Sequence, residues 1–240
     1  MTAAPNNASI NSSKIDFPAS LTGADRPGFG SAIDFEQVYA AARGEASRVP
    51  WAAGCACPVL AEWLNTEAPL LVRPGSRAVV VGCGLGDDVV ELAGRGYDVL
   101  GFDLAPTAVR WAALRNPDHA ARFLQADLLS MPARLQRRFD LVVEVHTIQS
   151  IAPESRPAVA QSLANLLAPR GVMLAVCRGR DQAQPLHECL GPPWPLTSRE
   201  LQEMLAGAGL YPVHGEPAVI EAWDQEEPPK RRLRGTFTRV

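Results

Sequence analysis

Residues 77–88 have the sequence RAVVVGCGLGDD, which is the clearest structural signal in this chain. Its first part, residues 78–81, is a short apolar run rich in β-branched side chains, which is typical of a strand buried on both faces. The glycines that follow, Gly82, Gly84 and Gly86, tolerate positive φ and carry no Cβ that would block a ligand. A helical pattern comes next. The stretch therefore predicts a strand, a glycine turn and a helix whose N-terminus offers unpaired N–H groups.

The spacing of these glycines favours one kind of ligand. A dinucleotide-binding turn has the pattern G-x-G-x-x-G, whereas here the position of the third glycine is taken by Asp87. A G-x-G-x-G turn followed by acidic residues suits a ligand with a carboxylate and an ammonium group better than a pyrophosphate. Taken alone, the turn also fits a tight structural turn that binds nothing.

Length, charge and cysteine content exclude several classes of protein. A chain of 240 residues is long enough for one domain with a substantial core, and its net charge of −3 gives no basic field for nucleic acid. The first residues lack the features of a secretory signal, and no apolar run is long enough to span a membrane. The five cysteines are scattered, and Cys55 and Cys57 have no second pair at zinc spacing. These features predict a reduced, cytoplasmic protein without a metal site or a membrane partner.

Strand and helix signals alternate along most of the chain, which predicts an α/β fold with a mostly parallel sheet and helices on both faces. Residues 1–30 are expected to form a flexible tail. Residues 31–240 are expected to form one domain, with a helical cap at 31–75 and a Rossmann-like core at 76–240. Beyond the glycine turn we expect strands at 97–103, 122–125, 139–145 and 172–176, and helices at 106–115, 154–167 and 197–208. Two strand-like segments at 211–223 and 233–240 predict an antiparallel C-terminal hairpin.

Acidic residues stand at the ends of the next two predicted strands. Asp103 ends the second strand, where an acid accepts hydrogen bonds from ribose hydroxyls, although it would also cap the helix that follows. Asp127 ends the third strand, where an adenine amino group would be read. Because parallel strands end at one edge of a sheet, the glycine turn and both acids predict a nucleotide-like ligand there.

With these residues the sequence resembles the class I S-adenosylmethionine-dependent methyltransferases, and within them the thiopurine S-methyltransferases and their bacterial thiol and tellurite-resistance relatives. The segment VVVGCGLGDDVVELAGRGYDVLGFDLAPTAV carries the family's first block. Further matches are Pro-Trp-x-x-Gly at 50–54, P-x-x-R-P at 153–157, L-L-x-P-x-G at 166–171 and Gly-Pro-Pro at 191–193. The resemblance covers about residues 35–240. It implies a Rossmann-like sheet of seven strands, S-adenosylmethionine as cofactor and a monomer.

The resemblance also implies roles for individual residues. The glycines would hold the methionine part of the cofactor, Asp103 the ribose, and Asp127 with Leu128 the adenine. Trp51 would pack near the sulfonium or the substrate, or else anchor the N-terminal helices. The implied cofactor-binding set is Trp51, Gly82, Cys83, Gly84, Gly86, Asp103, Leu104, Asp127, Leu128, Glu144 and Val145.

The candidate catalytic residues are Glu144, His146 and Arg156. Glu144 replaces the aspartate that many relatives carry at the end of the fourth strand, and Arg156 would orient or polarise the acceptor. His146 would either take a proton from the nucleophile, since the unperturbed pKa of histidine is near 6.5, or form a hydrogen-bonded wall. A thiol supplies thiolate near neutral pH without a base, because its pKa is about 8.5.

The favoured function is therefore methyl transfer from S-adenosylmethionine to a small molecule, with a thiol sulfur preferred over a nitrogen or oxygen of a heteroaromatic or secondary metabolite. A nicotinamide-dependent oxidoreductase is disfavoured by the glycine spacing. Nucleic-acid methylation is disfavoured because the one dense basic cluster, residues 230–234, is interpreted as a solvated hairpin loop. A binding module that retains the site without catalysis is a further alternative.

Overall fold

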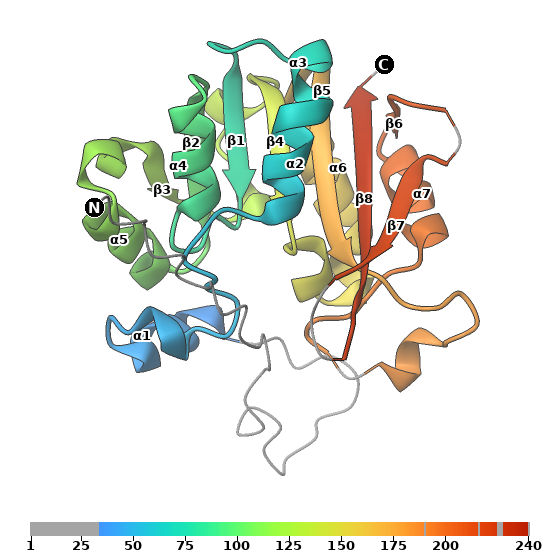
Figure 1. Ribbon diagram of the computed structural model, residues 1–240, viewed down its shortest axis with the longest axis horizontal. Coiled ribbons are helices and arrows are strands. Elements are labelled where there is room, and N and C mark those ends of the chain that lie inside the picture. The colour runs from blue at the N-terminus through green and yellow to red at the C-terminus, as the bar shows by residue number, and fades with distance from the viewer. Residues whose placement is uncertain (1–33, 190, 216, 225–227, 240) are drawn as a thin grey trace, which may run out of the picture.

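The computed structural model describes residues 34–189, 191–215, 217–224 and 228–239 (Figure 1). The expected tail at residues 1–30 lies outside this range. Within it the chain forms one sheet of eight strands in the order β3-β2-β1-β4-β5-β8-β6, with β7 paired to β8. The strands are β1 (Arg77–Val81), β2 (Asp98–Asp103), β3 (Phe123–Gln125), β4 (Phe139–Val145), β5 (Leu167–Arg178), β6 (Leu210–Pro212), β7 (Val219–Trp223) and β8 (Arg231–Arg239).

Strands β1 to β5 run parallel, and β8 runs antiparallel to β5, β6 and β7. This confirms the predicted fold class and the C-terminal hairpin. The expected strand at 211–223 divides into two, since β6 pairs with residues 237–239 of β8 and β7 with residues 231–235. The sheet therefore has one strand more than the seven expected.

The α-helices begin and end close to the expected positions. Pro58 and Pro106 start α2 and α5, and Thr197 forms a capping box with Glu200 at the start of α7. One helix is shorter than expected, because Leu167 already pairs with Phe139 as the first residue of β5. The α-helices are α1 (Phe35–Ala42), α2 (Pro58–Thr66), α3 (Ala68–Leu71), α4 (Asp87–Gly94), α5 (Pro106–Arg115), α6 (Arg156–Leu166) and α7 (Ser198–Gly207).

The central strand β1 is buried on both faces, as its composition predicts. Ala78 and Val80 pack into a cluster with residues of α2 and α4, and Val79 and Val81 pack into another with residues of α6 and α7. In Figure 1, α2 and α4 lie in front of the sheet and α6 lies behind it. Among the residues that the structure describes, no helix is both long and apolar enough to cross a membrane.

The first helix lies at the edge of the sheet where the parallel strands end. In Figure 1 the arrowhead of β1 points to this edge, and α1 lies beside it next to α5. Tyr39 and Ala42 of α1 are buried against Leu85 of the glycine turn and Ala105 and Ala108 at the start of α5. Helix α1 thus packs against the glycine turn, at the edge where the sequence predicts a ligand.

Candidate functional site

The glycine turn is packed so closely that side chains would not fit. Gly82, Gly84 and Gly86 have φ values of 61°, 52° and 89°, a region that residues with a Cβ rarely adopt. A Cβ on Gly82 would lie 2.5 Å from the Thr147 hydroxyl oxygen, and one on Gly86 would lie 2.6 Å from the Phe123 ring. The intervening Cys83 is buried beneath the turn. Neighbouring side chains therefore hold the turn in one shape, and that shape requires glycine at these positions.

Asp103 joins the end of β2 to this turn. Its Oδ2 accepts a hydrogen bond from the Gly84 N–H at 2.9 Å, and its Oδ1 accepts one from the Ala105 N–H at 2.9 Å, just before α5. Burial raises the pKa of this carboxyl. Each carboxylate oxygen has a second lone pair, so the group can accept hydroxyl hydrogens as well. Beside it the Leu104 side chain is exposed, an apolar surface at the strand end.

Tyr39 and Trp51 cover the turn. The Trp51 indole N–H donates to the Tyr39 hydroxyl at 2.7 Å, and Phe35 and Tyr39 both meet Trp51 edge to face. A Cβ on Gly84 would lie 3.1 Å from the Tyr39 hydroxyl oxygen. Burial raises the pKa of Tyr39. Tyr39 is a site residue that the sequence did not reveal, because its apolar spacing with Phe35 indicates only a helix face.

The start of α5 and the start of α4 hold the N-terminal segments in place. The Glu36 carboxylate of α1 accepts hydrogen bonds from the backbone N–H and the hydroxyl of Thr107. The Asp88 carboxylate accepts the Cys57 N–H at 2.7 Å, and burial raises the pKa of Asp88 to about 6. Both acids sit near helix N-termini, where negative charge is favourable.

Glu144 ends β4 inside the protein. One carboxylate oxygen accepts the Thr147 and Ile148 N–H groups at 2.6 and 2.9 Å, and the other lies 3.5 Å from the Cys177 sulfur. Burial raises the pKa of Glu144 to about 7. The side chain therefore holds the 146–148 turn against the glycine turn, while the adjacent Val145 is half-buried.

Substitution of Glu144 by glutamine tests whether burial raises the pKa of this carboxyl group. Because its pKa is raised, the folded protein binds the proton more tightly than the unfolded chain, so stability falls as pH rises from about 4.5 through about 7. Glu144→Gln keeps an acceptor for both N–H groups but does not titrate. We expect it to match wild type in urea unfolding below pH 5 and to exceed it by roughly 3 kcal/mol at pH 8. Equal free energies of unfolding for wild type and Glu144→Gln at pH 8 would contradict the raised pKa of Glu144.

His146 follows in the left-handed region, with φ of 64°. Its Nδ1 lies 3.2 Å from Gln149 Oε1, and its Nε2 lies 3.5 Å from Arg232 Nη1. Burial, with the charges of Arg232 and Arg178, lowers the pKa of His146 to about 3. The imidazole is therefore neutral near pH 7 and a weak base, which favours the wall interpretation over proton abstraction.

Two arginines meet a carboxylate at the same edge. Arg178 and Arg232 face each other across β5 and β8, and both donate to Asp224 Oδ2, at 2.8 and 3.1 Å. The interpretation of residues 230–234 as a solvated loop is therefore wrong. Residues 231–234 belong to β8, which starts at the edge where β4 and β5 end, and Lys230 directly precedes this strand. Arg234 pairs with Glu67, at the end of α2.

Arg156 lies at the start of α6 and is buried. It donates to the Trp194 carbonyl, and the Trp194 N–H in turn donates to the Gln149 carbonyl at 2.7 Å. The structure thus connects Arg156 to His146 through the 191–196 loop and Gln149, and places it in no direct hydrogen bond with either His146 or Glu144.

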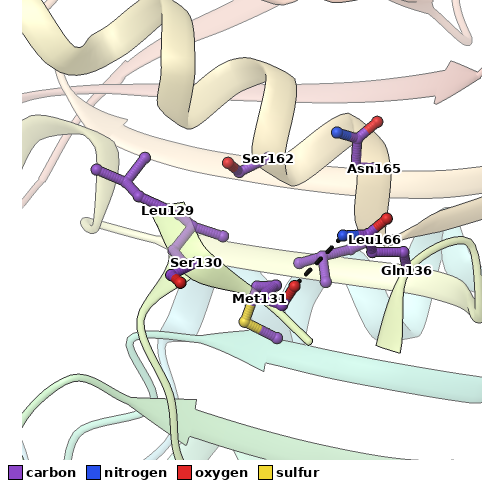
Figure 2. A pocket seen from close by; sticks show the side chains of 8 residues that line it. Leu129, Ser130, Met131, Gln136, Ser162, Asn165 and Leu166 are labelled. Atoms are coloured by element: carbon purple, nitrogen blue, oxygen red, sulfur yellow. Dashed lines mark hydrogen bonds between the residues drawn. The ribbon is translucent and has the colours of Figure 1, made fainter. Parts of the chain in front are cut away.

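Asp127 and Leu128 begin the turn after β3. The Asp127 carboxylate accepts the Leu129 N–H at 2.9 Å, and Leu128 is buried. Figure 2 shows a pocket of about 220 Å³ behind this turn, between Met131 and Gln136 on one side and Ser162 and Asn165 of α6 on the other. Leu128 also lines it, but neither Asp103 nor the glycine turn does, so this pocket is separate from the predicted ligand edge.

A family model and two curated plant proteins that match this chain are all described as methyltransferases. A model described as "Methyltransferase domain" matches residues 78–171. The chain is 31% identical over 172 residues to "Probable thiol methyltransferase 2" of Arabidopsis thaliana, covering 69% of this chain and 70% of that protein. It is 29% identical over 175 residues to "Thiocyanate methyltransferase 1" of the same plant, covering 70% of each.

A solved structure shares the fold. It is the 1,6-didemethyltoxoflavin-N1-methyltransferase of Burkholderia thailandensis with bound 1,6-didemethyltoxoflavin and S-adenosylhomocysteine, with a TM-score of 0.67. The match covers 90% of this chain and 93% of that one at 18% identity. At this identity the likeness shows a shared fold and does not identify the acceptor of this chain.

Proposed function

Because this chain belongs to the class I S-adenosylmethionine-dependent methyltransferases, we propose that it methylates the sulfur of a small, anionic acceptor. Its cofactor is S-adenosylmethionine, which supplies a methyl group on an already activated sulfonium. The protein's share of the chemistry is then to bind both molecules, align them and keep water out.

The residues at the edge fit this cofactor. The glycine turn leads directly into α4, and no side chain caps the N-terminus of that helix. The backbone N–H groups of a first helical turn favour a carboxylate such as that of the methionine part. We assign Gly82, Gly84 and Gly86 to the methionine part, and Asp103 to the ribose. Tyr39 and Trp51 would close over the turn and exclude water.

The acceptor assignment rests on one observation above all, the position of Arg232. Its guanidinium lies beside His146 at the carboxyl end of β4, and Arg178 lies on the neighbouring strand. These two guanidinium groups share the Asp224 carboxylate between them. A site with two guanidinium groups favours a thiolate or another sulfur anion over a neutral amine or alcohol. The names of the plant relatives, a thiol and a thiocyanate methyltransferase, support the same choice. No base is required, because a thiol ionises without help near neutral pH.

A matched set of acceptors tests the proposal. The full chain and S-adenosylmethionine would be incubated with thiophenol, phenol or aniline, which differ in the accepting atom, and with hydrosulfide and thiocyanate. The reference pKa values of about 8.5 for the cysteine thiol and about 10 for the tyrosine phenol predict about thirtyfold more anion for an alkyl thiol than for a phenol at pH 7.5. An aryl thiol such as thiophenol is more acidic than an alkyl thiol, so about thirtyfold is a lower bound for this pair. We expect kcat/KM for thiophenol to exceed that for phenol by at least this factor. Methylation of phenol or aniline with none of the sulfur compounds would overturn the proposal.

A further inference from the structure

Gln149 is fixed in one orientation. The backbone N–H of Arg178 donates to its Oε1, which identifies the accepting atom of the side-chain amide as oxygen. Its own backbone carbonyl accepts the Trp194 N–H at 2.7 Å, and the residue is buried. The side-chain amide of Gln149 therefore offers its oxygen, which can only accept a hydrogen bond, to the side chain of a neighbouring residue.

That residue is His146. Gln149 Oε1 lies 3.2 Å from its Nδ1, and since the oxygen can only accept, Nδ1 must carry the ring hydrogen. In the neutral imidazole the lone pair then stands on Nε2. Nε2 lies 3.5 Å from Arg232 Nη1, which can only donate. The tautomer that Gln149 imposes is thus the one that accepts from Arg232.

Arg232 is held from its other side as well. Its Nε donates to Asp224 Oδ2 at 3.1 Å, and the same oxygen accepts from Arg178 Nη1 at 2.8 Å. The guanidinium is therefore fixed between the carboxylate of Asp224, which follows β7, and the imidazole of His146, which follows β4.

We propose that Gln149 and His146 are positioning residues, which orient the Arg232 guanidinium toward the acceptor through the Nδ1–H tautomer of His146. The kinetic consequence rests on the proposed sulfur acceptor, whereas the tautomer does not. In this arrangement the lone pair of His146 is committed to Arg232, so the ring acts through the arginine and not on the proton of the acceptor.

The tautomer is measured first, on the unliganded wild-type chain. Nitrogen-15 NMR of the imidazoles distinguishes a hydrogen on Nδ1 from one on Nε2, and the signal of His146 is identified by its loss in His146→Asn. We expect His146 to be neutral at pH 7 with its hydrogen on Nδ1. A hydrogen on Nε2, or a charged ring, overturns the proposal, whatever the acceptor.

Kinetics test the consequence for the acceptor. Asparagine tolerates the left-handed backbone at 146 but does not reach Arg232. We expect His146→Asn to raise KM for thiophenol roughly tenfold, the effect of one lost hydrogen bond to a charged group, with kcat and KM for S-adenosylmethionine near wild type. His146→Gln places an amide oxygen within reach of Arg232 and should recover part of this loss, since glutamine fits the left-handed backbone less well than asparagine. His119→Asn, at the opposite edge near Arg77, is the matched control and should change neither constant.

An unchanged KM for thiophenol in His146→Asn overturns the positioning role. If the wild-type chain methylates no sulfur compound at all, the proposed function fails instead. The NMR result then still shows whether Gln149 imposes the Nδ1–H tautomer on His146.

Discussion

Replacement of Gly86 by alanine is expected to lower the free energy of unfolding by about 2–5 kcal/mol and to abolish detectable cofactor binding. A φ of 89° costs a residue with a Cβ about 1–2 kcal/mol. The new methyl would also lie 2.6 Å from the Phe123 ring, an overpacking that costs typically about 1–3 kcal/mol. Relief of this contact would shift the backbone that cradles the ligand. Thermal unfolding and calorimetric titration with S-adenosylmethionine measure the two effects.

Gly94→Ala is the matched control for this change. Gly94 lies at the end of α4, nothing lies within 4 Å of its missing Cβ, and it has no positive φ. Alanine is there expected to stabilise the protein by roughly 0.4–1 kcal/mol and to leave cofactor affinity unchanged. A Gly86→Ala variant that binds the cofactor as wild type does would show that the turn is not the cradle.

Replacement of Asp103 by alanine is expected to weaken cofactor binding by about 1–3 kcal/mol, or roughly 5- to 150-fold in Kd. The change removes an acceptor for ribose hydroxyls and leaves the Gly84 and Ala105 N–H groups without their carboxylate. Both losses weaken the ligand site at the carboxyl ends of β1 and β2. Titration calorimetry with S-adenosylmethionine gives the affinity, and urea unfolding separates it from any loss of stability.

Asp98 serves as the control on the same strand. It lies at the opposite end of β2, is exposed and forms one long ion pair with Arg122 at 3.6 Å. Asp98→Ala should therefore bind the cofactor as wild type does. Equal affinities for Asp103→Ala and Asp98→Ala would remove Asp103 from the ribose site and leave it as the residue that fixes the turn.

The helices and strands could be predicted from the sequence where adjacent residues alone determine the element. The apolar run at 78–81, the proline at 106 and the capping box at 197–200 each depend on neighbouring residues alone, and each element lies where they predict. The division of 211–223 into β6 and β7 was missed, because it depends on how the chain pairs with β8.

The site was predictable only in its glycine turn and strand-end acids. Tyr39 has the spacing of a core residue, and nothing in the sequence shows that its hydroxyl meets Trp51 above the turn. Arg232 is 86 positions from His146, and only the register of β8 against β5 brings the two together. The pKa of His146 could not be predicted either, since it depends on burial and on two arginines from other strands.

Calorimetric titration of the full chain with S-adenosylmethionine, S-adenosylhomocysteine and NAD tests whether the glycine turn and Asp103 bind the methyl donor. The glycine turn, Asp103 and the covering aromatic residues predict binding of the first two ligands with micromolar dissociation constants and no binding of NAD. Binding of NAD alone would contradict the assignment of this edge of the sheet and every residue role derived from it.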